Sequence, residues 1–403
     1  MPEQIEGRRR LPVSPAIIVG VLWVVVITIL LVRSILKPGS GTVFPIFYTA
    51  GGRWLQAENL YQGGTDYLYS PLIAAFFAPF SLLPMWAANL AWRALNIALY
   101  LGAVRLWLRR GTSRIPPANE VVVFLLLLPL SIGSLNNAQS NPLLIAIIMG
   151  ALVAARSGRW ALSALCVGLI TYLKIYPLAV GLLLVVLFPK KLGWRLAVAL
   201  VALGALSFVL QKPSYVLEQY RNWAATRSVD ERHYDIMNRP RDLWTLLYAC
   251  GIELNLRLYF LVQILGGAAI AALCVFGRWR QWATDRLLTA VFTLVTSWML
   301  LLGPATESAT YIILAPAICL ATVEAFSRPF PRWMRTLAVT AVSILIGGAA
   351  FIAWAGRRRD LYSMSIQQFG TVLFVIFVIA WLFRDSLWSD SRTADSASPP
   401  GLP

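Results

Sequence analysis

Long apolar runs, separated by short clusters of arginine and lysine, constrain this chain more than any other feature. The runs recur between Ala16 and Trp381, and 58% of the 403 residues are hydrophobic while only 13% are charged. A soluble fold has too little interior to bury so many long runs, whereas helices that cross a lipid bilayer require them. The sequence therefore predicts an all-α, polytopic transmembrane protein.

The net charge of +17 follows the same pattern. Lysine and arginine fall in short clusters between the apolar runs, as expected of segments that stay on the cytoplasmic side of a membrane and contact anionic lipids. No basic, aromatic-interleaved soluble module is present, so the composition argues against nucleic-acid binding. The basic clusters lie at residues 8–10, 105–114, 156–159, 190–195, 278–286 and 328–335.

The alternation of apolar runs and basic clusters predicts about twelve spans with both termini in the cytoplasm. The first run, residues 16–36, is longer than a signal-peptide core and has no convincing cleavage site, so we expect an uncleaved span. Residues 71–108 are expected to enter as a short broken segment before the main span, because Pro79 and Pro84 interrupt them. We expect a bacterial-type inner membrane protein with one membrane domain, residues 1–385, and a disordered tail, residues 386–403.

This topology places the stretches with mixed polar chemistry at the outer face, including long outer loops at residues 37–70 and 211–255. Any catalysis is therefore predicted to face outward. The four cysteines show no paired spacing, and neither a disulfide nor a metal or cofactor site follows from the sequence. The polar stretches are residues 42–69, 136–141, 174–177, 211–255 and 304–310.

Several of these stretches carry a resemblance. The front of the chain reads G-T-x-F-P-x-F-Y-x-A-G, then N-L-Y, then Y-x-Y-S-P-L-I-A-A-F-F-A-P-F, and N-A-Q-S-N-P-L-L and L-K-I-Y-P-L follow further on. In order and spacing these segments resemble glycosyltransferase family 87, a family of type-C membrane glycosyltransferases. The resemblance implies transfer of a hexose, mannose in some members, from a polyprenyl-phosphate carrier to a lipid or glycan acceptor.

Such a transfer needs cations that stabilise the departing phosphate. Lys174 follows an apolar run and precedes Ile-Tyr-Pro, so its ammonium either contacts the donor phosphate or snorkels to the membrane interface without a ligand. Arg53 is a second candidate, with a solvated or headgroup-facing arginine as the alternative. The other predicted substrate-binding residues are amides beside the lysine and tyrosines that stack on sugars or belong to the interfacial aromatic belt: Gln139, Asn141, Tyr176, Tyr48 and Tyr69.

The transfer also needs a base for the acceptor hydroxyl. The resemblance implies an aspartate in the pattern T-D-F-P, but Val43 occupies that position here. The candidates are Asp66, Glu307 and Glu58. Asp66 is equally explained as a turn residue after two glycines, and Glu307 as a helix cap.

Two further hypotheses stay open at this stage. The single histidine, His233, lies among charged residues of the second outer loop and suggests a solvated surface rather than a metal site. The missing aspartate leaves a catalytically inactive relative, such as a lipid-binding assembly factor, as one alternative. A flippase or transporter of lipid-linked sugars is the other, although the spans themselves carry few charges.

Overall fold

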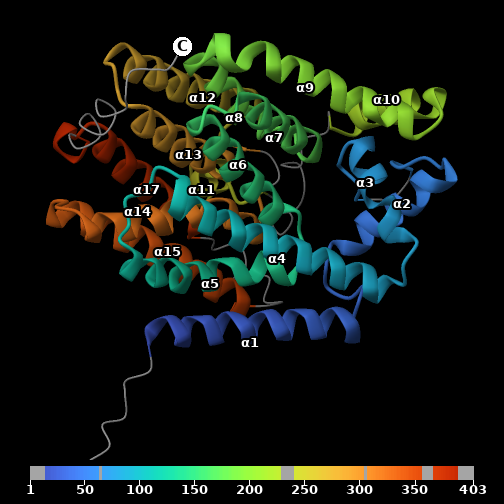
Figure 1. Cartoon of the computed structure of the whole chain (residues 1–403), viewed down its shortest axis with the longest axis horizontal. Helices are drawn as coiled ribbons and strands as arrows, with labels where there is room; N and C mark the ends of the chain where they lie inside the picture. Colours follow the sequence, from blue (N-terminus) through green and yellow to red (C-terminus); the bar gives the residue numbers. More distant parts are fainter. Residues whose placement is uncertain (1–13, 63–65, 228–239, 304–305, 356–365, 389–403) are drawn as a thin grey trace, which may run out of the picture.

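The computed structural model describes residues 14–62, 66–227, 240–303, 306–355 and 366–388. Within these ranges the chain forms helices and turns and no strand (Figure 1). The prediction of an all-α fold is confirmed. In chain order the elements are α1 (Pro15–Leu36), α2 (Phe44–Gln56), α3 (Pro71–Ser81), α4 (Met85–Arg110), η1 (Pro117–Asn119), α5 (Glu120–Asn136), α6 (Asn141–Arg156), α7 (Trp160–Leu173), α8 (Leu178–Leu187), α9 (Pro189–Leu210), α10 (Pro213–Arg227), α11 (Leu243–Ala249), α12 (Leu256–Trp279), α13 (Thr284–Leu301), η3 (Ser308–Ile313), α14 (Ala315–Ser327), α15 (Arg332–Ala355), α17 (Gln367–Leu382) and η4 (Asp385–Leu387).

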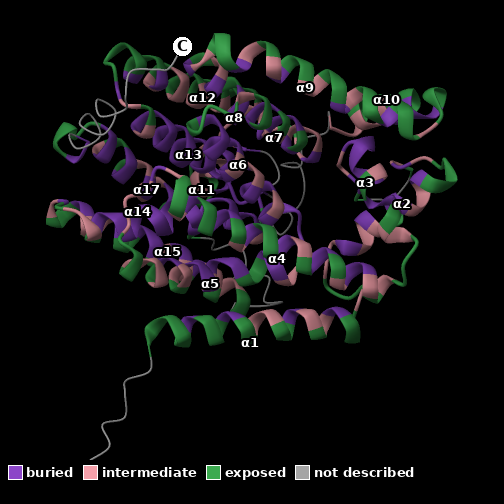
Figure 2. Cartoon of the chain, in the orientation of Figure 1, coloured by how far each residue is buried: buried purple, intermediate pink, exposed green. Residues whose placement is uncertain are grey.

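The apolar runs of the sequence become helices because a backbone in hydrocarbon must satisfy its own hydrogen bonds. Among the described residues, five helical segments are long and apolar enough to cross a bilayer alone, and six shorter apolar helices accompany them. α1 lies along one edge of the bundle, and most of its surface is exposed (Figure 2). These observations support a polytopic membrane protein, while the count of about twelve spans stays a prediction.

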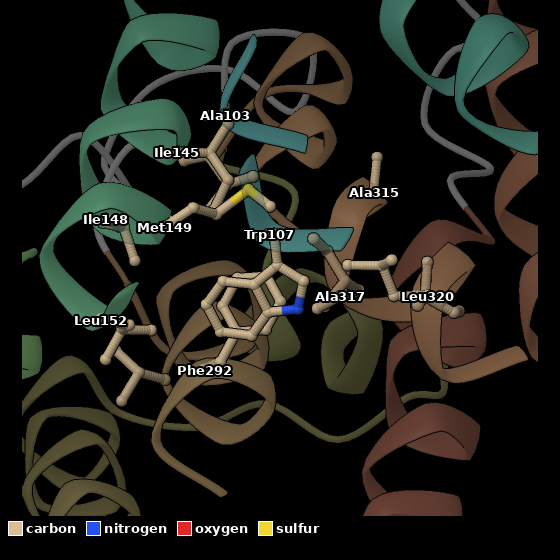
Figure 3. Packing of buried hydrophobic residues seen from close by; sticks show 14 of the residues in the cluster. Ala103, Trp107, Ile145, Ile148, Met149, Leu152, Phe292, Ala315, Ala317 and Leu320 are labelled. Carbon is tan, nitrogen blue, oxygen red and sulfur yellow. The ribbon is translucent and has the colours of Figure 1, made fainter. Parts of the chain in front are cut away.

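The centre of the bundle is a close-packed core to which α4, α6, α13 and α14 contribute (Figure 3). Trp107 of α4 lies against Phe292 of α13, with ring centroids 4.4 Å apart. Ile145 and Met149 of α6 are fully buried beside them. This apolar interior fixes the relative positions of the helices whose ends build the polar sites described below.

The helix ends form two chemically different surfaces. One, which we call the site end, gathers the α5–α6 turn, the α7–α8 turn and the residue before η3 through side-chain hydrogen bonds. The other, which we call the basic end, is held by arginine contacts, among them the pair of Arg156 with Asp285 and the bond from Arg278 to the Leu187 carbonyl. Polar groups are therefore concentrated where helices end.

The regions expected as outer loops contain helices of their own. α2 lies inside residues 37–70, and α10 and α11 lie inside residues 211–255. Phe44, Phe47 and Trp54 recur at helical spacing and bury one face of α2 against α3. A Cβ built on Gly51 would lie 2.5 Å from the Phe77 carbonyl oxygen, so the two helices touch only because position 51 is glycine. These helices were not predicted, because the apolar periodicity is short, and the placement of both regions outside the membrane stays a prediction.

Two predictions about chain breaks are settled by the structure. The chain breaks between α3 and α4, and Pro84 precedes the first residue of α4, as the prolines predicted. The tail, however, does not become irregular at Ser386. Leu387 and Trp388 are buried, and the Trp388 indole donates to the Trp381 carbonyl at 3.0 Å. Large apolar side chains hold this start of the tail against the bundle, and the rest of the tail lies outside the described residues.

Candidate functional site

A chain of hydrogen bonds connects four polar side chains at the site end. The Lys174 ammonium donates to Asn141 Oδ1 at 2.8 Å, and Asn141 Nδ2 donates to Gln139 Oε1 at 2.6 Å. Gln139 Nε2 then donates to Glu307 Oε2 at 2.9 Å. We call Lys174, Asn141, Gln139 and Glu307 the polar network. It links residues up to 168 positions apart in the sequence.

Each member of the polar network lies at a helix terminus. Asn141 is the first residue of α6, and Gln139 lies in the turn before it. Lys174 is the residue at which α7 ends, in an extended backbone conformation, and Glu307 precedes η3. Backbone groups at helix ends lack intrahelical partners, so polar side chains are tolerated there inside an otherwise apolar bundle.

The α5–α6 turn is held in a strained conformation. Ala138 has φ of 52°, in the left-handed region that residues with a Cβ seldom adopt. The indole of Trp92, a fully buried residue of α4, donates to the Ala138 carbonyl at 2.9 Å. The Val43 amide donates to the Asn137 carbonyl at 3.1 Å. These contacts fix the direction in which Gln139 and Asn141 present their amides.

Position 43 therefore borders the polar network. Its backbone bonds the turn two residues before Gln139, and its own side chain is partly buried and apolar. A carboxylate at this position would lie next to the turn that carries Gln139. Among the described residues, the carboxylate that belongs to the polar network is that of Glu307.

Glu307 has two structural partners. It forms a reciprocal capping box with Thr310 at the start of η3, in which the Glu307 amide donates to Thr310 Oγ1 at 3.1 Å. The same side chain accepts the hydrogen bond from Gln139 and is exposed. The interpretation of Glu307 as a helix cap is thus confirmed, and the cap holds its carboxylate beside the network.

Lys174 lies beside an aromatic ring and is half-buried. Its ammonium is 5.9 Å from the centroid of the Tyr176 ring. Burial raises the pKa of the Tyr176 hydroxyl above its ordinary value, so the phenol stays protonated and remains a donor. The described contacts of the ammonium are thus with the Asn141 amide and the face of the Tyr176 ring, both at the site end.

The structure gives the other predicted residues different surroundings. Asp66 and Glu58 are exposed, and among the described residues their carboxylates accept no hydrogen bond. The Tyr48 hydroxyl donates to the Leu83 carbonyl at 3.0 Å, so it ties α2 to the α3–α4 break. Tyr69 packs on Phe47 with ring centroids 4.7 Å apart. His233 lies outside the described residues.

Several buried polar atoms at the site end have no hydrogen-bond partner among the described residues. They are Ser140 Oγ, between the two network amides, and Thr306 Oγ1, next to Glu307. Arg53 Nη1 of α2 and Ser70 Oγ, just before α3, are buried without a partner as well. Buried polar groups in folded proteins are nearly always paired, with protein, water or a ligand. These atoms indicate that the site end is completed by a polar ligand or by bound water.

Comparison with known families agrees with the helical bundle and its polar end. Residues 67–304, more than half of the chain, match the sequence profile of Glycosyltransferase family 87. The chain belongs to glycosyltransferase family 87. No curated protein matches the chain in a sequence search. Family membership establishes a membrane glycosyltransferase with a sugar donor and an acceptor as substrates.

The family 87 match contains Gln139, Asn141 and Lys174, whereas Val43 precedes it and Glu307 follows it. Two contributors to the site were missed in the sequence. Trp92 and Arg93 are buried in α4 and bond the carbonyls of Ala138 and Leu135. A signal was present, because Arg93 belongs to a polar stripe with Asn89 and Asn96 at helical spacing within an apolar run.

Proposed function

We propose that this family 87 protein transfers a hexose from a polyprenyl-phosphate carrier to a hydroxyl of a lipid or glycan acceptor at the polar network. The observation that carries the proposal is the hydrogen-bonded series from Lys174 to Glu307, which sets a cation and a carboxylate at opposite ends of two amides. Glycosyl transfer needs both groups, one at the departing phosphate and one at the attacking hydroxyl.

Lys174 is the group suited to the donor phosphate. Its ammonium is a compact charge at a helix end, where a lipid-linked phosphate meets the membrane boundary. As the bond between the sugar C1 and the phosphate oxygen breaks, negative charge grows on the phosphate, and the ammonium stabilises it. Tyr176 adds a neutral hydroxyl close to the lysine. Arg53, with one buried and unpartnered Nη1, is the second cation available to the carrier.

Glu307 is the carboxylate suited to the acceptor. It takes the proton of the acceptor hydroxyl as that oxygen forms its bond to C1, and the products are a glycoside and the polyprenyl phosphate. Attack opposite the departing phosphate inverts the configuration at C1. Gln139 holds the carboxylate at 2.9 Å, and Asn141 and Gln139 lie between base and cation, where sugar hydroxyls find amide partners.

The outward direction of the site rests on charge. Arginine and lysine clusters lie at the basic end, where α4, α6 and α12 end and where α9 begins. Positively charged connections remain on the cytoplasmic side, so the basic end faces the cytoplasm and the site end faces the outer surface of the inner membrane. Both termini are then cytoplasmic.

The test is a transfer assay with the full chain in proteoliposomes. Labelled polyprenyl-phosphate mannose is supplied first, followed by other polyprenyl-phosphate hexoses, together with a panel of lipid and glycan acceptors. We expect label to move to an acceptor with wild-type protein and not with Glu307→Gln. If no donor and acceptor in a broad panel supports transfer, the proposed reaction is wrong.

A further inference from the structure

A second polar cluster lies beside the turn of the polar network and uses none of its members. Arg93 of α4 donates from Nε to Asn89 Oδ1 at 3.1 Å and from Nη1 to the Leu135 carbonyl at 2.7 Å. Arg33, near the end of α1, donates from Nη1 to Asn136 Oδ1 at 2.8 Å. Since the two guanidinium groups bond consecutive residues of α5, they lie close together. We call Arg33 and Arg93 the arginine pair.

The arginine pair has no counter-charge in the described part of the chain. Neither residue forms an ion pair with an aspartate or glutamate there, and their partners are amides and a carbonyl. Arg93 is 2% exposed, and its Nη2 atom is buried without a hydrogen-bond partner. The charge of Arg33 also acts on Arg93. A buried cation beside a like charge is strongly unfavourable unless an anion joins them.

The surroundings of the pair favour an anion that belongs to a lipid. Arg33 is only partly buried, and it belongs to α1, whose apolar side chains are mostly exposed along the edge of the bundle (Figure 2). Gly41, with φ of 63°, lies close to the guanidinium, because a Cβ there would be 3.3 Å from Arg33 Nη2. Guanidinium groups bind phosphate oxygens through paired hydrogen bonds.

We propose that the arginine pair binds the phosphate of an anionic lipid at the site end, between α1 and α4. The phosphate enters past Arg33 and neutralises the pair. The more deeply buried Arg93 supplies positive charge that helps to retain the anion. Because Arg93 and Arg33 also bond Leu135 and Asn136, the lipid supports the end of α5 that leads into the α5–α6 turn.

The experiment measures lipid retention, which is independent of sugar transfer. Full-chain protein is titrated with phosphatidylglycerol or phosphatidylcholine and examined by native mass spectrometry. The variants are Arg33→Gln and Arg93→Gln, with Arg105→Gln as the matched control, because Arg105 is an exposed arginine of the same helix. Wild type and R105Q are expected to retain phosphatidylglycerol over phosphatidylcholine. R33Q and R93Q each weaken retention about tenfold, the effect of one lost charge-assisted hydrogen bond.

A competition arm separates two sources of the phosphate. Unlabelled polyprenyl monophosphate is added to wild type loaded with phosphatidylglycerol. Displacement identifies the carrier lipid as the occupant, and persistence identifies a membrane phospholipid. The proposal is overturned if R33Q and R93Q retain phosphatidylglycerol as well as R105Q does, or if wild type does not distinguish the two phospholipids. Thermal unfolding of each variant is recorded, and R33Q alone decides if R93Q fails to fold.

Discussion

Charged side chains have different partners at the two ends of the bundle. At the basic end, carboxylates are paired directly with arginines. Arg156 bonds both carboxylate oxygens of Asp285, at 2.7 and 3.0 Å, and Arg286 bonds Asp385 at 2.7 Å. At the site end, Lys174 and Glu307 belong to one network but are separated by two neutral amides.

The difference teaches what each end is built for. The charge of a carboxylate in a direct ion pair is compensated, and the pair connects two segments, as Arg286 and Asp385 connect α13 and η4. At the site end, the described contacts hold the Glu307 carboxylate by the Gln139 amide and the Lys174 ammonium by the Asn141 amide, so the two groups do not pair with each other. We therefore expect the carboxylate and the ammonium of the polar network to act on different groups of the substrates, which the ion pairs of the basic end are not placed to do.

The largest expected effect is that of Glu307→Gln. Glutamine still accepts hydrogen bonds at the start of η3 but takes no proton, so the transfer rate should fall by about a hundredfold or more. The matched change at the basic end is Asp285→Asn. It removes a partly exposed ion pair, costs about 1 kcal/mol or less, and should leave the rate unchanged. Initial rates in proteoliposomes measure both, and equal losses in the two variants would remove the distinction between the ends.

Lys174→Gln should have the next largest effect. The glutamine amide still bonds Asn141 but carries no charge for the departing phosphate, so kcat/KM for the donor should fall about tenfold to a hundredfold. Lys191→Gln is the control. Lys191 lies over the Trp160 ring at 5.5 Å, on a lysine-rich helix start away from the network. A donor titration distinguishes them, and an unchanged kcat/KM in K174Q would contradict the assignment.

Gln139→Leu tests the connection between the two charged residues. Leucine fills similar space but bonds neither Asn141 nor Glu307, and Glu307 loses the donor that orients it. We expect about a tenfold lower transfer rate with a smaller change in thermal unfolding, since a hydrogen bond to a charged group is worth about 1.5–3 kcal/mol. Gln56→Leu, an exposed position at the end of α2, should change neither quantity. Equal rates in both variants would show that the amide is dispensable.

The smallest effect is expected from Trp92→Phe. The substitution keeps most of the buried ring but removes the indole N–H that holds the Ala138 carbonyl, so the rate should fall a few-fold, about 1 kcal/mol in activation free energy. Trp107→Phe is the counterpart on the same helix, where the indole bonds Ser113 at 2.9 Å. A few-fold loss in both variants would mean that the effect reflects general packing and not the turn.

Most of the fold could be predicted from the sequence because it rests on local properties. Hydropathy and proline positions predicted α1 and the broken segment that becomes α3 and α4 within a few residues, since a span in hydrocarbon needs a continuous apolar segment. α2 and α10 were missed because their apolar faces are short and are completed by long-range contacts. The Tyr215 hydroxyl of α10, for example, donates to the Glu58 carbonyl 157 residues earlier.

For the candidate site too, the local features could be predicted from the sequence and the long-range contacts could not. Gln139, Asn141, Lys174 and Glu307 were identified one by one, because each is a polar residue at the end of an apolar run. That they form one hydrogen-bonded series depends on the packing of α5, α6, α7 and η3, which no local pattern contains. Arg93 was overlooked because one arginine inside an apolar run changes the mean hydropathy of that run very little. Its helical spacing from Asn89 nevertheless indicates a buried polar stripe.

The central claim is that Glu307, among three carboxylates considered from the sequence, is the base. The direct test compares the variants Glu307→Gln, Asp66→Asn and Glu58→Gln in one proteoliposome assay with a donor and acceptor that wild type uses. The structure bonds only Glu307, among these three, to the polar network in the described chain, so E307Q should lose transfer about a hundredfold or more while D66N and E58Q stay within a few-fold of wild type. Loss of transfer in D66N or E58Q with full activity in E307Q would contradict the account.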